Sequence, residues 1–127
     1  MNRPTRTVVY VEDEPAVQRL VAFWLEDAGF RVLLAGDGAA GLALIRAERP
    51  DLVITDALMP VMTGDELVEA LHHDPDLAHI PIVMATAAAS PLRVQRMKSL
   101  GCTSVIAKPL EEQTLLAVVA EALATAG

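Results

Sequence analysis

The chain has 127 residues, 53% of them hydrophobic, which is enough for one domain with a substantial buried core. The formal net charge of −7 argues against a nucleic-acid-binding surface, because binding to a phosphate backbone requires a cationic surface. No apolar run approaches the roughly 18 residues that cross a bilayer, and residues 1–6 lack a signal-peptide core, so we expect a cytoplasmic protein without membrane contact.

The first apolar run, residues 7–11, predicts a strand that ends at Glu12 and Asp13. A helix follows from Pro15, because proline suits the first helical turn, where its missing N–H has no partner to lose. Gly29 ends this helix, whose apolar residues recur on one face: Val17, Leu20, Val21, Trp24 and Leu25.

A second strand over residues 31–35 is followed by Asp37, the expected N-cap of a helix that ends near Glu48. The stretch from Gly36 to Gly41 matches G-x-G-x-x-G, so a dinucleotide-binding enzyme is an alternative hypothesis. That hypothesis leaves the other strand-end residues unexplained, and the chain has no room for a second nucleotide-binding half. We expect instead that these small residues let the helix lie close to the sheet.

The central apolar run, residues 52–55, is bounded by turn-forming residues and predicts a strand that is buried on both faces, as in parallel sheets. It ends at Asp56, where open α/β sheets place their ligand crevices. A loop over 61–64 follows Pro60, and the next helix ends at the sequence His72-His73-Asp74-Pro75.

The last two strands, residues 82–85 and 105–107, end at Thr86 and Lys108, and a helix follows each, over 91–100 and 111–124. Alternating strands and helices predict a doubly wound α/β domain with a parallel sheet covered on both faces. The lone Cys102 is expected to be a small buried residue rather than a reactive thiol. Six further residues are expected to face solvent: His72, His73, His79, Arg93, Arg96 and Lys98.

Four of the strands end in residues suited to chemistry at one edge of the sheet. Glu12, Asp13 and Asp56 offer only oxygen ligands, which favours a hard cation such as Mg²⁺. Without a cation these carboxylates would repel one another. Lys108 can neutralise part of their charge or bind a phosphoryl group, and Thr86 adds a hydroxyl. The cluster therefore favours in-line phosphoryl transfer, in which a carboxylate can be the nucleophile.

These residues stand in motifs that together resemble the receiver domain of two-component response regulators: Glu12-Asp13, Asp56-x-x-Met59-Pro60-x-Met62-x-Gly64, Thr86-Ala87 and Lys108-Pro109. The resemblance covers residues 7–124, so we expect a disordered tail over 1–6 and a short tail over 125–127. It implies a flavodoxin-like (βα)₅ fold with strand order 2-1-3-4-5.

The resemblance also implies a phosphoacceptor and a metal site. Asp56 would receive the phosphoryl group from a histidine kinase or a phosphotransfer protein. Asp13 would bind Mg²⁺ directly and Glu12 through water, while Asp56 and the backbone carbonyl of Leu58 would complete the protein ligands.

Lys108 and Thr86, with Ala87, would bind the phosphoryl oxygens, and movement of Thr86 would change the surface around the last two helices. The Lys108–Pro109 bond would be cis and would direct the ammonium group at Asp56. The family usually carries an aromatic switch residue three positions before this lysine. Here that position is Val105, so motion coupled to Thr86 is less expected than phosphorylation itself.

Two further positions influence hydrolysis of the phosphorylated form in the resembled family, and here they are Leu58 and Ala88. Neither side chain can bind a water molecule, so we expect a long-lived phosphorylated form.

The resemblance implies a signalling protein rather than an enzyme. Because no output domain follows Gly127, we expect the effector to be a separate protein. The apolar stripe of the helix over 111–124 is wider than one buried face needs. Either its alanines account for the width, or that flank meets a partner or a second copy through the helices over 91–100 and 111–124. The rival hypothesis is a receiver-like scaffold that is never phosphorylated, which the complete set of charged site residues disfavours.

Overall fold

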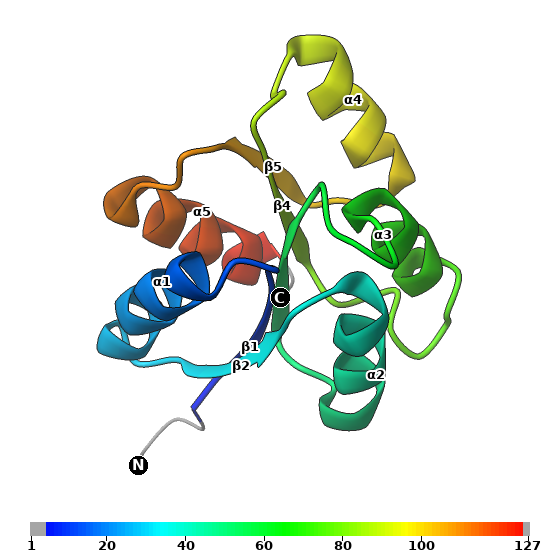
Figure 1. Ribbon diagram of the computed structural model, residues 1–127. Coiled ribbons are helices and arrows are strands. Elements are labelled where there is room, and N and C mark those ends of the chain that lie inside the picture. Colours follow the sequence, from blue (N-terminus) through cyan, green and yellow to red (C-terminus); the bar gives the residue numbers. More distant parts are fainter. Residues whose placement is uncertain (1–4, 126–127) are drawn as a thin grey trace.

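Five strands alternate with five helices in the computed structural model, which describes residues 5–125 (Figure 1). The strands are β1 (Thr7–Val11), β2 (Arg31–Ala35), β3 (Leu52–Asp56), β4 (Ile82–Thr86) and β5 (Ser104–Ala107). The helices are α1 (Pro15–Asp27), α2 (Gly38–Glu48), α3 (Gly64–His72), α4 (Pro91–Leu100) and α5 (Glu112–Thr125). The predicted tails overlap residues 1–4 and 126–127, which lie outside the described residues.

All strand pairs are parallel, and the strand order β2-β1-β3-β4-β5 confirms the predicted fold. Helices α1 and α5 cover one face of the sheet, and α2, α3 and α4 cover the other (Figure 1). Each face has its own aliphatic core because successive strand residues point to opposite sides. No helix within residues 5–125 combines the length and apolar character that a bilayer span requires.

Local signals in the sequence explain most helix boundaries. The Asp37 side chain accepts a hydrogen bond from the Ala40 N–H at 2.8 Å, so it caps α2 as predicted. Helix α3 begins with a capping box in which Thr63 and Glu66 bind each other's backbone N–H groups. The strand β5 begins one residue before the predicted position, and α5 begins one residue after it.

Two glycines of the G-x-G-x-x-G stretch, Gly38 and Gly41, allow α2 to pack closely against neighbouring segments. A Cβ atom on Gly38 would lie 2.4 Å from the Met62 carbonyl oxygen, and one on Gly41 would lie 2.7 Å from Cγ2 of Val11. Both distances are shorter than real contacts allow, so a larger side chain would push α2 away from the loop after β3 at Gly38 and away from β1 at Gly41. This confirms the expectation that small residues bring this helix close to β1.

The expectations for surface residues are mostly confirmed, with one error. All three histidines, Arg96 and Lys98 are exposed, and Cys102 is buried, which raises the pKa of its thiol to about 12. Arg93 was predicted to face solvent, which is wrong. Its guanidinium donates to Asp65 at 3.2 Å, and both side chains are partly buried. This ion pair joins α4 to α3, two helices that the sequence pattern could not place side by side.

The wide apolar stripe of α5 is used within the domain. Leu115, Val119 and Leu123 are buried, and Leu116 and Val118 pack against the same core. Within residues 112–125, no large apolar side chain of α5 is strongly exposed. The width of the stripe therefore needs no partner to explain it.

Candidate functional site

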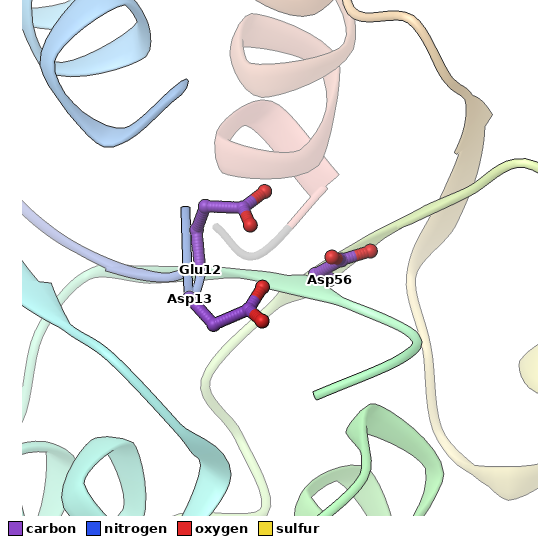
Figure 2. A group of neighbouring side chains, drawn as sticks. All are labelled: Glu12, Asp13 and Asp56. Carbon is purple, nitrogen blue, oxygen red and sulfur yellow. The ribbon is translucent and has the colours of Figure 1, made fainter. Parts of the chain in front are cut away.

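Parallel pairing brings the ends of β1 and β3 together. Val11 lies opposite Thr55 in the register, so the residues that follow, Glu12 directly after β1 and Asp56 at the end of β3, lie next to each other. Asp13 completes the group, and one carboxylate oxygen from each of the three side chains lies within 4.8 Å of the others. Figure 2 shows Glu12 and Asp13 side by side after β1, with Asp56 across from them on β3.

Lys108 reaches this acid cluster from β5. Its Nζ lies 3.0 Å from Oδ2 of Asp56 and 3.5 Å from Oε1 of Glu12. Burial alone would lower the pKa of Lys108, but the hydrogen bond to Asp56 and the charges of both acids outweigh it, and the pKa is raised. The Lys108–Pro109 peptide bond is cis, which confirms the prediction.

Asp56 is held by its immediate neighbours. Its side chain is almost fully buried, and Oδ1 accepts a hydrogen bond from the Ala57 N–H at 2.9 Å. Its carbonyl oxygen accepts from the Thr55 hydroxyl at 3.0 Å. A Cβ atom on Gly64 would lie 2.3 Å from that same carbonyl oxygen, so only glycine lets α3 begin here.

Glu12 is buried more deeply, at 1% exposure, and both of its carboxylate oxygens have donors. Oε2 accepts from the Glu14 N–H at 3.1 Å, and Oε1 accepts from the Tyr10 hydroxyl at 3.3 Å as well as from Lys108. Burial, above all, raises the pKa of Glu12, and the charge of Asp56 adds to this effect. The period of two in a strand places Tyr10 and Glu12 on one face, but Tyr10 stands in an apolar run, so the sequence does not mark its hydroxyl as a donor.

A small cavity of about 140 Å³ opens beside Asp56. Its lining residues are Asp56, Ala57, Leu58, Thr86, Ala87, Ala88 and Lys108. Thr86 is buried, and its Oγ1 accepts a hydrogen bond from the Ala88 N–H at 3.1 Å. Leu58 is 76% exposed at the rim. The cavity and the acid cluster share Asp56, and Lys108 lines the cavity and contacts the cluster, so most of the predicted site residues meet at one place.

Val105 lies apart from this cavity. It is opposite Met84 in the β4–β5 register and is half-buried against the core beneath α2, α3 and α4. Pro109 follows Lys108 and is exposed.

Comparison with known proteins gives one consistent result. The family model for the response regulator receiver domain matches residues 8–120. The chain is 32% identical over 105 residues to the polar-differentiation response regulator DivK of Brucella anthropi, which covers 83% of this chain and 85% of DivK. It is 39% identical over 117 residues to the hybrid signal transduction histidine kinase D of Dictyostelium discoideum, which covers 91% of this chain but 7% of that protein.

The fold comparison agrees. The structure of the chemotaxis response regulator CheY4 of Vibrio cholerae matches with a TM-score of 0.89 and 35% identity, over 94% of this chain and 99% of that one.

Proposed function

Because this chain belongs to the response regulator receiver domain family, we propose that it accepts a phosphoryl group on Asp56 from a histidine kinase or a phosphotransfer protein. One observation supports Asp56 above the other acids. Among the described residues that line the cavity, it alone carries a carboxylate, and that carboxylate contacts Lys108 at 3.0 Å. It is therefore a nucleophile beside a space that an incoming phosphoryl group can enter.

In the transfer, one carboxylate oxygen of Asp56 attacks phosphorus. A P–O bond forms as the P–N bond of the donor histidine breaks, and the leaving nitrogen keeps the electron pair and takes up a proton. Lys108 turns from the carboxylate to the new phosphoryl oxygens. Thr86 uses its hydroxyl oxygen to accept from Ala88, so its own proton is free to be donated to a phosphoryl oxygen.

The donor set fits Mg²⁺. Three carboxylates within 4.8 Å of one another face one lysine, so the cluster carries an excess of negative charge and only oxygen ligands. We propose that Asp13, Asp56 and the Leu58 carbonyl hold the ion, with Glu12 acting through water. When bound, the ion neutralises charge on the transferring phosphoryl group.

Labelling with the small phosphodonor acetyl phosphate tests the proposal. The wild type should be labelled with Mg²⁺ and not with EDTA, and Asp56→Asn should be unlabelled because it lacks the nucleophile. Asp27→Asn, which removes an exposed carboxylate at the end of α1, is the matched control and should be labelled like the wild type. Equal labelling of Asp56→Asn and wild type would refute the assignment. No labelling of the wild type, even by a histidine kinase, would favour the scaffold hypothesis.

Members of the receiver domain family are signalling modules, and this chain belongs to that family. We propose that it does not turn over a substrate as an enzyme does. We place its receiver domain at residues 7–124 and expect it to act on an effector through protein contacts. A homodimer through α4 and α5 is a further proposal, which sedimentation velocity of the phosphorylated and unphosphorylated protein tests directly.

A further inference from the structure

The hydroxyl of Tyr10 lies buried beneath the acid cluster. Tyr10 is 1% exposed and belongs to β1, two positions before Glu12. Residues two apart in a strand point to the same face, so Tyr10 and Glu12 share the side of the sheet that α1 and α5 cover. The oxygen of Tyr10 lies 3.3 Å from Oε1 of Glu12.

This contact has a defined direction. An ionised carboxylate can only accept, so the phenol donates its proton to Glu12. The ring of Tyr10 belongs to the apolar core on this face of the sheet, and Glu12 is the hydrogen-bond partner of its hydroxyl. A buried hydroxyl without a partner costs about 1–3 kcal/mol, whereas phenylalanine would fill the same space without that cost. The hydroxyl therefore has one evident use, which is to hold Glu12.

The hydrogen bond from Tyr10 matters most when Lys108 no longer donates to Glu12. Oε1 now has two donors, Tyr10 and the Nζ of Lys108 at 3.5 Å. Under the proposed function Lys108 turns toward the phosphoryl oxygens. Tyr10 is then the side-chain donor that stays on Oε1, while the Glu14 N–H stays on Oε2.

We propose that Tyr10 is a positioning residue for the Mg²⁺ site, since its hydroxyl holds the Glu12 carboxylate in the orientation from which it engages the cation, before and after phosphorylation. The inference rests on the proposed function of the acid cluster. Groups that hydrogen-bond a metal ligand from behind commonly change metal affinity by about 10- to 100-fold when they are removed. Because Glu12 is expected to act through water, we expect the effect here at or below the low end of that range.

Titration calorimetry of Mg²⁺ into the unphosphorylated protein measures the effect. Tyr10→Phe should weaken Mg²⁺ binding by roughly three- to tenfold. The control is Thr103→Val, which removes a hydroxyl that accepts from the Ile82 N–H, away from the acid cluster. It should leave the Mg²⁺ affinity unchanged, and thermal unfolding in EDTA should show that both variants are folded.

A double-mutant cycle separates positioning from a general structural role. In a Glu12→Gln background, Tyr10→Phe should change Mg²⁺ affinity by less than about twofold, because the group that it positions is gone. In a Lys108→Met background, its effect should exceed that in the wild type, because Oε1 then loses both side-chain donors. Equal effects in all three backgrounds would indicate a structural role and overturn the proposal.

The failure of this inference is distinguishable from failure of the site itself. Equal Mg²⁺ affinities for wild type and Tyr10→Phe would overturn the role of Tyr10 alone. No Mg²⁺ binding by the wild type would overturn both the role of Tyr10 and the proposed metal site.

Discussion

Lys108 is one positive charge set among three carboxylates. It bonds to Asp56 and Glu12, but it cannot neutralise both of these and Asp13. The Lys108 side chain is 27% exposed, so solvent weakens its ion pairs somewhat, while Glu12 is almost completely removed from water. Burial raises the pKa of Glu12, so the titration of this carboxylate should be visible in the stability of the protein.

We predict that the free energy of unfolding in Mg²⁺-free buffer falls as the pH rises above about 4.5, the ordinary pKa of this glutamate. Burial raises the pKa of Glu12 in the folded state, so the folded protein binds more protons than the unfolded one above that pH. Lys108, with its raised pKa, loses its contribution only above its ordinary value of 10.5 and stays charged in this range.

Glu12→Gln removes the titrating group, so the free energy of unfolding of this variant should decline less steeply with pH than that of the wild type. The two slopes should differ by up to about 1.4 kcal/mol per pH unit. Urea unfolding in EDTA at a series of pH values measures both slopes. Parallel curves for the two proteins would contradict the prediction.

A second prediction at this scale concerns the lifetime of the phosphorylated form. Leu58 and Ala88 line the same cavity as Asp56, and neither can hold an attacking water. Leu58→Asn and Ala88→Glu introduce groups that can, so both should release phosphate faster, by roughly tenfold. Phosphate release is followed after removal of the donor. If the polar variants are no faster than wild type, Mg²⁺ and Lys108 set the lifetime without these side chains.

At the scale of the elements, the close approach of α2 to β1 depends on Gly41. Alanine normally stabilises a helix interior relative to glycine by about 0.5–1 kcal/mol. At Gly41, however, the added Cβ would lie 2.7 Å and 3.1 Å from the two γ carbons of Val11. Valine has little rotamer freedom to move aside, and it immediately precedes Glu12.

We therefore predict that Gly41→Ala lowers the free energy of unfolding by about 1–3 kcal/mol. Gly36→Ala is the control, because its Cβ would meet nothing within 4 Å and its effect should stay within about 0.5 kcal/mol. Combining Gly41→Ala with Val11→Ala should cost less than the sum of the two single changes. Additive losses would show that the two residues do not collide. Chemical denaturation measures all four variants.

The elements were predictable because local chemistry marks their ends. Each of the first four strands was predicted to within one residue, since apolar runs stop at charged or hydroxyl residues and at prolines. Contacts between distant segments were not predictable in this way. The Arg93–Asp65 ion pair joins residues 28 positions apart, on two helices that the sequence pattern could not place side by side. Tertiary packing decides such contacts, and no local pattern in the sequence indicates them.

The backbone conformation of Val61 could also not be predicted from the sequence. Its φ of 70° lies in the left-handed region, which β-branched residues rarely adopt, and its side chain is 80% exposed. The sequence predicted a loop over 61–64, but nothing in it indicated a left-handed conformation at this valine.

At the scale of the molecule, the parallel sheet places every charged site residue at one edge, so the fold itself concentrates like charges. A cation that binds only there must stabilise the whole domain by mass action. We predict that Mg²⁺ at 100 times its Kd raises the free energy of unfolding by about 2.7 kcal/mol.

Asp13→Asn should lose most of this gain, because Asp13 is exposed and its replacement should perturb the apo fold little. Thermal unfolding with and without Mg²⁺ at constant ionic strength measures the difference. A gain in Asp13→Asn equal to that of the wild type would place the stabilising ion elsewhere.

The site residues lie far apart in the sequence, and this has a consequence for when the site can form during synthesis of the chain. Glu12 and Lys108 are 96 positions apart, and they meet only after β5 has joined the sheet beside β4. A nascent chain that has not yet released β5 from the ribosome lacks the lysine and cannot assemble the site. Two separately expressed halves would regain acetyl phosphate labelling only by joining into one sheet. Under the proposed function, labelling of Asp56 would therefore report complete assembly of the chain, independent of any signalling partner.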